Sequence, residues 1–270
     1  MKPFTELPRS TFKSAILKVE RANEHIGNIE KTLGAIREAT THALTINDDF
    51  HREKTRVEEV TVDWGPFLAG LDLLRVTTGD AVHNLRSALD HLAYGIVSAF
   101  EDPPNYLYFP IDGELNSLIA QPSFRIIERL APDIAHLIIS EIRPYGAGNP
   151  FVKLNHLDRA DKHRLLLTNT GTGAFRVLVS TKDDDVPHTA ANCFILIKDD
   201  PLSDGLRVPR AGTASAEHND QYRRATFDVC FDKGLPFENE PIVPTMHQLT
   251  QVVARATNVL TTHCFGQREA

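Results

Sequence analysis

The sequence predicts an α+β fold: an N-terminal helical bundle with one inserted strand or hairpin, a β-rich C-terminal section, and a final helix packing back on the bundle. Through most of residues 1–166, apolar residues recur every three or four positions, as in amphipathic helices. After Leu167 the chain becomes rich in β-branched and aromatic residues, which favour strands. Helical spacing returns at the C-terminal end. The predicted elements follow the order expected of segregated α and β layers: helices first, then strands, then a final helix.

Five segments have helical spacing, and two prolines help to define them. Pro66 begins the second segment, where proline is well tolerated because the first turn needs no N–H donor. Pro132 lies inside the third segment and is expected to kink or divide it. The five predicted helices cover residues 8–44, 66–100, 124–142, 151–166 and 245–263.

Strands are predicted where apolar and polar residues alternate. Val60, Val62 and Trp64 alternate with Thr61 and Asp63, which places a strand within 55–64, between the first two helices. Further strands are expected at 175–181, 192–198, 206–208 and 224–231. We therefore divide the chain into a helical domain, 1–166, and a β-rich section with the last helix, 167–270, which together form one continuous unit.

Composition excludes several classes of protein. The 270 residues are 41% hydrophobic and 24% charged, which is ordinary for a globular protein. The net charge of −7 argues against binding nucleic acid through bulk charge. No apolar run reaches about 18 residues, and no secretory signal is visible, so we expect a cytoplasmic protein without a membrane segment. The 3 cysteines lack a C-x-x-C pair, which argues against a zinc ribbon or a disulfide scaffold.

One helix carries an unusual polar face within Asp80–Tyr94. On a helical wheel its apolar residues fill one arc, and the opposite arc contains neither Lys nor Glu, the residues common on solvated helices. That arc instead holds two His, one Arg, two Asp, one Asn and one Ser, which are for the most part mediocre helix formers. Two explanations remain open: a structural network of buried polar groups, or a reaction site.

Within this arc, Arg86 and His91 form an R-x4-H pattern that resembles the motif of the HEPN superfamily, many of whose members are metal-independent ribonucleases. The resemblance implies a homodimer in which His91 transfers protons and Arg86 holds the phosphate. His83, Asn84 and Asp90 would then support them. The inserted strand and the β-rich section depart from the usual all-helical HEPN domain.

The wider stretch from Gly79 to Ala93 also resembles a family of uncharacterised bacterial proteins, which share a downstream Asp-Lys-His-Arg at 161–164. This second resemblance spans most of the chain and implies no particular activity.

A second polar cluster lies in the predicted helix 151–166. Asp161 falls on its apolar side, where an unpaired carboxylate is costly. We expect it to contact a basic group: Arg86, His83 or Arg164. It would either tie the two helices together or, with His163 nearby, orient a catalytic side chain. A metal site built from the histidines of both clusters is a third possibility, but no H-E-x-x-H or E-x-x-H spacing is present.

The resulting functional hypothesis is a metal-independent endoribonuclease or RNA-binding protein, acting as a homodimer without cofactor or metal. The alternative is a non-catalytic ligand-binding or interaction protein in which the polar helix face is a structural network. No phosphate-binding loop, dinucleotide fingerprint or nucleophile elbow is present to support another enzyme class.

Overall fold

The fold was analysed from a computed structural model. It describes residues 9–42, 45–48, 57–61, 65–163, 174–179, 191–196, 206–209, 229–232, 234–238 and 240–266.

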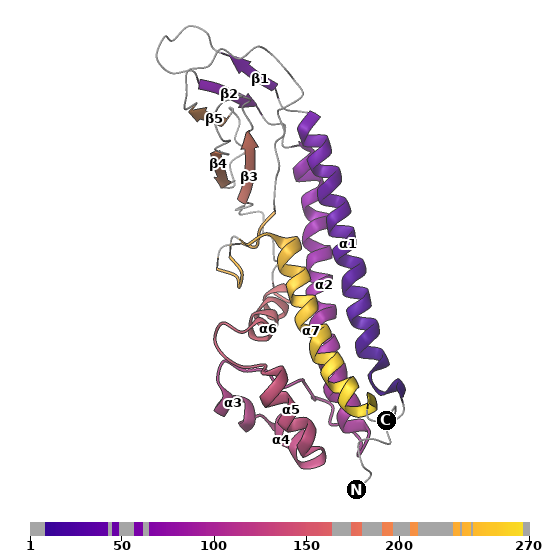
Figure 1. Ribbon diagram of the computed structural model, residues 1–270. Coiled ribbons are helices and arrows are strands. Elements are labelled where there is room, and N and C mark those ends of the chain that lie inside the picture. The colour runs from indigo at the N-terminus through magenta and orange to yellow at the C-terminus, as the bar shows by residue number, and fades with distance from the viewer. Residues whose placement is uncertain are drawn as a thin grey trace.

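Three long helices form the body of the molecule (Figure 1). They are α1 (Lys13–His42, 30 residues), α2 (Gly65–Ser98, 34 residues) and α7 (Ile242–Phe265, 24 residues). A 3₁₀ turn at Arg9–Phe12 precedes α1. Helices α1 and α2 run antiparallel along most of their length, and α7 packs against both, so the last helix does return to the bundle.

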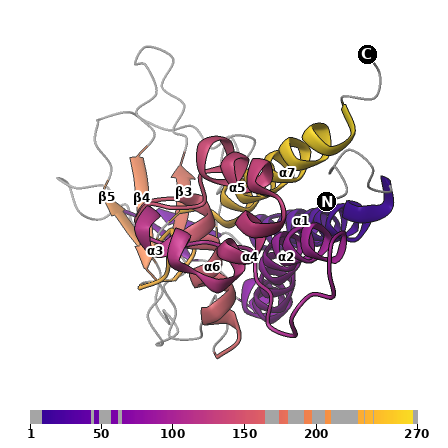
Figure 2. The same ribbon diagram turned by 90° about the horizontal axis from the view of Figure 1, so that it is seen from below.

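A layer of shorter helices covers one side of α2 and α7 (Figure 2). These are α3 (Leu115–Ala120), α4 (Pro122–Leu130), α5 (Pro132–Leu137), a π-helical turn (Ile138–Ile142) and α6 (Pro150–Asp161). Pro132 divides α4 from α5, as predicted, because Ala131 leaves the helical conformation at φ −144° and ψ 72°. Helix α6 begins where the side chain of Asn149 accepts a hydrogen bond from the N–H of Phe151.

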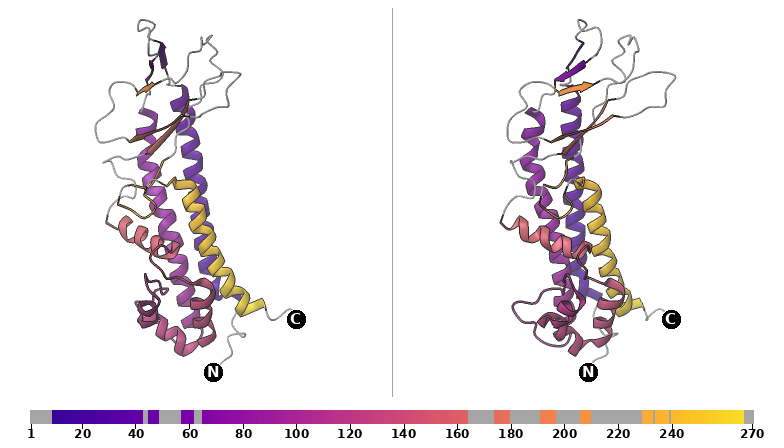
Figure 3. Two further views of the ribbon diagram at one scale, coloured as in Figure 1. Left: turned by 60° about the vertical axis from the view of Figure 1, so that its left-hand side comes forward. Right: turned by 90° about the vertical axis from the view of Figure 1, so that its left-hand side faces the viewer.

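Five short strands lie near the end of the bundle where α1 ends and α2 begins (Figure 3). They are β1 (Thr45–Asp48), β2 (Val57–Thr61), β3 (Ala174–Val179), β4 (Ala191–Leu196) and β5 (Leu206–Pro209). One antiparallel sheet has the order β1-β2-β5, with Thr45 opposite Thr61 and Val57 opposite Pro209. The other is the antiparallel pair β3-β4, with Ala174 opposite Leu196.

The predicted α+β class is wrong, because the described residues are mostly helical. The strands are only four to six residues long, whereas the three main helices have 24 to 34 residues. Sheets of two and three such strands are marginal on their own and do not form the second layer that an α+β fold requires. Most of the predicted strand at 224–231 lies outside the described residues.

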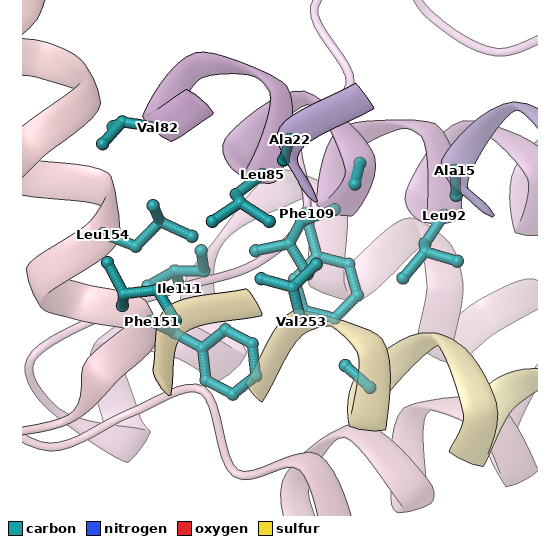
Figure 4. Packing of buried hydrophobic residues seen from close by; sticks show 14 of the residues in the cluster. Ala15, Ala22, Val82, Leu85, Leu92, Phe109, Ile111, Phe151, Leu154 and Val253 are labelled. Carbon is teal, nitrogen blue, oxygen red and sulfur yellow. The ribbon is translucent and has the colours of Figure 1, made fainter. Parts of the chain in front are cut away.

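The core lies between α1, α2, α6 and α7 (Figure 4). Every residue of the apolar arc predicted for α2 is fully buried: Ala81, Val82, Leu85, Ala88, Leu89, Leu92, Ala93 and Ile96. Phe109 and Ile111, from the segment after α2, pack beside Phe151 and Val253. This core fixes α2 in rotation about its axis and therefore decides which of its side chains face outward.

None of the described helices combines the length and the apolar character needed to cross a membrane.

Candidate functional site

The outward side of α2 carries the residues that we call the α2 polar face: Asp80, His83, Ser87, His91 and Tyr94. Asp80, His83 and Tyr94 are exposed, and Ser87 and His91 are partly exposed. They recur every three or four residues and therefore form one stripe along the helix. Residues beside the stripe make contacts with α1 on one side and α6 on the other.

His83 is the most precisely held side chain of this face. Its Nδ1 lies 2.9 Å from Oδ1 of Asp158, and the Asp158 side chain is only 4% exposed. Because a carboxylate only accepts, Nδ1 carries the proton, and in the neutral imidazole Nε2 is then the acceptor. Nε2 lies 3.4 Å from Oγ of Ser87, one turn along α2. The His83 side chain is 54% exposed, so the ring lies at the surface of the protein.

Asp158 is the buried carboxylate that joins the two polar clusters. Besides His83, it accepts a 2.6 Å hydrogen bond from Nζ of Lys162, one turn further along α6. The sequence predicts this joining role for Asp161 instead. The i,i+4 spacing of Asp158 and Lys162 predicts that these two side chains meet, but it does not predict that Asp158 faces α2.

Asp161 instead packs against a glycine of α2. A Cβ placed on Gly79 would lie 2.3 Å from Oδ1 of Asp161, so the two helices approach closely only because residue 79 lacks a side chain. Among the described residues Asp161 forms no hydrogen bond or ion pair with Arg86 or His83, although His83 and Lys162 are close enough to act on it electrostatically; Arg164 lies outside the described residues. Burial raises the pKa of Asp161, and the nearby carboxylates Asp158 and Asp80 raise it further.

Arg86 belongs to a buried network rather than to the exposed stripe. It is only 7% exposed; its Nη1 donates to Asp90 at 2.5 Å and its Nε donates to Asn155 of α6 at 2.9 Å. The same Asp90 oxygen also accepts from the N–H of Phe109. Burial raises the pKa of Asp90, against the opposing effects of Arg86 and the Phe109 N–H. This network ties α2 to α6 and to the segment that follows α2.

The remaining predicted site residues lie apart from one another. The amide oxygen of Asn84 accepts from Nζ of Lys18 at 3.3 Å, and its amide nitrogen donates to the carbonyl of Asp80, so it faces α1. His91 is partly exposed, eight residues beyond His83, which is about 12 Å along a helix axis. His163 is exposed just beyond the end of α6. Arg86 and His91 therefore do not converge on one point within a single chain.

A hollow of about 340 Å³ adjoins the buried network. It lies between one side of α6 and the turn at residues 111–113, and Asn155 contributes both to its wall and to the bond with Arg86. Sequence reasoning missed it, because its walls come from segments about 40 residues apart. It is lined by Ile111, Asp112, Gly113, Gln121, Val152, Asn155, His156 and Arg159.

The chemistry within reach is therefore proton transfer and hydrogen bonding. The α2 polar face offers an oriented imidazole, a hydroxyl and a second histidine, and Lys18 and Lys162 lie beside it. No group of three or more His, Cys, Asp or Glu side chains in the described ranges has the geometry of a metal site.

Comparisons of the chain with protein-family models, with curated proteins and with solved structures gave no match.

Proposed function

We propose that the protein is a metal-independent endoribonuclease whose proton-transfer group is His83, and that the α2 polar face is where RNA binds. The observation that carries the proposal is the position of the half-exposed His83 imidazole, with Nδ1 bonded to the buried Asp158 and Nε2 beside Ser87. A histidine fixed in this way by a buried carboxylate has one tautomer and one free acceptor, as a general base requires. Asp158 is a positioning residue in this proposal.

The proposed reaction uses the substrate's own hydroxyl as nucleophile. Nε2 of His83 takes the proton of a ribose 2′-hydroxyl, the 2′-oxygen attacks the adjacent phosphorus, and the P–O5′ bond breaks. The leaving 5′-oxygen takes a proton from a second acid, for which His91 is the candidate. The product strand ends in a 2′,3′-cyclic phosphate.

Although the net charge of the chain is −7, local side chains supply the positive charge and the aromatic surfaces that RNA binding needs. Lys18 and Lys162 stand on either side of α2 near His83 and suit phosphate groups. Tyr94 and Tyr108 are both more than half exposed. Tyr108 precedes Phe109, whose N–H bonds Asp90, so both tyrosines belong to the region around His91. Exposed aromatic rings are the surfaces on which single-stranded bases stack.

A homodimer would solve the separation of His83 from His91. If two copies pack with a two-fold axis passing near Ser87, residues whose numbers are equally spaced about 87 meet across it, so His83 faces the partner subunit's His91. Large apolar side chains exposed on α1 and α2, namely Leu17, Leu73 and Val76, support association through this side. Light scattering during size-exclusion chromatography tests the dimer. A monomer at micromolar concentration would remove His91 from the mechanism.

The decisive experiment uses His83→Asn. The Asn amide nitrogen can still donate to Asp158 but cannot transfer protons, so the fold is retained and cleavage of a single-stranded RNA should fall about 10²–10⁴-fold. Cleavage by the wild type should persist in EDTA. His136→Asn, at an exposed position on α5, is the matched control and should cleave normally.

The non-catalytic alternative is favoured by one observation, the burial of Arg86 in a fully structural network. In that case the wild type binds RNA or another ligand without cleaving it. Absence of cleavage by the pure wild-type protein, with the melting temperature of His83→Asn unchanged, would reject the nuclease and leave a binding protein.

A further inference from the structure

The hollow beside α6 is large enough to hold a small ligand. Its volume of about 340 Å³ is within the range of ligand pockets, at the small end. Two buried apolar side chains, Ile111 and Val152, form the apolar part of its lining. Exposed His156 and Arg159 stand on α6 toward solvent and bring donors and positive charge to its edge.

Arg86 holds the two walls of this hollow at a fixed separation. Its Nε bonds Asn155 in the α6 wall. Its Nη1 bonds Asp90, which in turn accepts from the backbone of Phe109, two residues before the opposite wall begins at Ile111. The buried guanidinium of Arg86 therefore connects both walls. In addition to stabilising the fold, this network fixes the shape of the hollow. Arg86 is a positioning residue for the hollow and does not line it.

The polar groups of the hollow form a specific pattern of acceptors and donors. Asp112 accepts from the amide nitrogen of Gln121 at 3.0 Å and from the N–H of Glu114 at 3.3 Å, which leaves acceptor capacity on both carboxylate oxygens. Gln121 also donates to the carbonyl of Ile111, so its own amide oxygen remains an acceptor. Asn155 uses its oxygen for Arg86 and keeps its amide nitrogen as a donor.

We infer that this hollow binds a guanine base with its adjoining phosphate, either in a free nucleotide or within an RNA chain. Among the four bases only guanine presents two neighbouring donors, N1–H and N2–H₂, and these match the two oxygens of one carboxylate, Asp112. The amide nitrogen of Asn155 suits the guanine O6 acceptor, and Arg159 suits the phosphate. The choice of a nucleotide rests on the proposed function. The preference for guanine rests on the hollow itself.

Calorimetric titration of the full chain with the 5′-monophosphates of guanosine, adenosine, cytidine and uridine tests the inference. Guanosine monophosphate should bind at least tenfold more tightly than the other three. Asp112→Asn should weaken it at least tenfold, and Asp102→Asn, exposed on the loop after α2, should not. Arg159→Gln should weaken guanosine monophosphate but leave guanosine unchanged, and Arg125→Gln on α4 is its matched control.

The outcomes separate this inference from the proposed function. Three results would overturn the guanine site, even if His83 proves necessary for RNA cleavage. They are equal affinity for the four nucleotides, no binding of any nucleotide, and an unchanged affinity for guanosine monophosphate in Asp112→Asn. Guanosine monophosphate binding by a protein that cleaves no RNA would support the site and reject the nuclease. A pentaribonucleotide containing one guanine shows whether the guanine comes from RNA or from a free nucleotide. If the protein binds the pentaribonucleotide more tightly than guanosine monophosphate, the ligand is RNA. If it binds both with equal affinity, the ligand is a mononucleotide.

Discussion

Arg86 and Asp90 lie one turn apart on α2, and the guanidinium donates to the carboxylate at 2.5 Å while its Nε reaches across to Asn155 on α6. The guanidinium side chain is 9% exposed and the Asp90 side chain 27% exposed, so neither charge is screened well by water. Removing one partner from such a pair leaves the other charged and poorly solvated.

Arg86→Met is therefore expected to lower the free energy of unfolding by about 3 kcal/mol, because it strands Asp90 and the amide oxygen of Asn155. Adding Asp90→Asn to Arg86→Met should restore part of that loss, since the stranded charge disappears. Urea denaturation followed by circular dichroism measures both. Arg125→Met, at an exposed position on α4, is the control and should change stability by less than about 0.5 kcal/mol. Equal loss in both Arg86→Met and the control would contradict the network.

The helices of this fold could be predicted from sequence because their apolar spacing is long and regular. The predicted break at Pro132 and all eight predicted core residues of α2 are confirmed. The three-or-four spacing in the first predicted helix also includes Ile16, but Ile16 is 39% exposed, because Ala15 takes the inward position. The β-rich section was overestimated, since β-branched composition reports only the preference for extended backbone and not whether partner strands extend the sheet.

The candidate site was only partly predictable. The polar arc of α2 could be found from its residue types, but a helical wheel cannot show which polar residue a neighbouring helix covers. Arg86 therefore seemed as accessible as His83, although α6 buries it. The contact that orients His83 comes from Asp158, 75 residues along the chain, and no local pattern specifies such a distant partner.

Gly79→Ala should destabilise the protein by about 1–3 kcal/mol. The new methyl group would lie 2.3 Å from Oδ1 of Asp161, so α6 must shift or the carboxylate must leave its position. Gly34→Ala in α1 is the matched control: nothing lies within 4 Å of its added Cβ, and it should stabilise the helix by about 0.5–1 kcal/mol. Thermal melting of the two variants, with Asp161→Ala added to each, tests the contact. A Gly79→Ala variant as stable as the wild type would show that the two helices do not approach so closely.

Cys264 should resist alkylation in the folded protein. It is 1% exposed, and burial raises the pKa of its thiol to about 12, with Asp133 contributing. At pH 8 only about 10⁻⁴ of the groups is thiolate, the reactive form, and the reagent must also reach it. Mass spectrometry after iodoacetamide treatment should find the peptide containing Cys264 unmodified until guanidinium unfolds the chain. Rapid labelling while circular dichroism remains native would contradict the buried position.

Asp161→Asn should stabilise the protein at neutral pH and change how its stability depends on pH. Burial raises the pKa of Asp161 in the folded state above its ordinary value, and Asp158 and Asp80 add to this. Between the unfolded-state pKa of about 3.9 and the higher folded-state pKa, the folded chain binds more protons than the unfolded chain. Its free energy of unfolding therefore falls as pH rises through this window, and the loss persists above it. Asn does not titrate, so the advantage of the variant over the wild type should be largest near pH 7 and shrink below about pH 4.

Urea denaturation of both proteins from pH 3.5 to pH 7.5 measures this difference. Asp102→Asn removes the same charge from an exposed loop and serves as the control for the change in net charge. The effect should amount to a fraction of a kcal/mol, because the carboxylate is only partly buried and water screens it. A variant that is less stable than the wild type at pH 7 would mean that Asp161 gains more from the nearby positive charge of Lys162 than it loses by burial. Asp161 would then join Asp158 and the Arg86–Asn155 hydrogen bond as a favourable contact between α2 and α6.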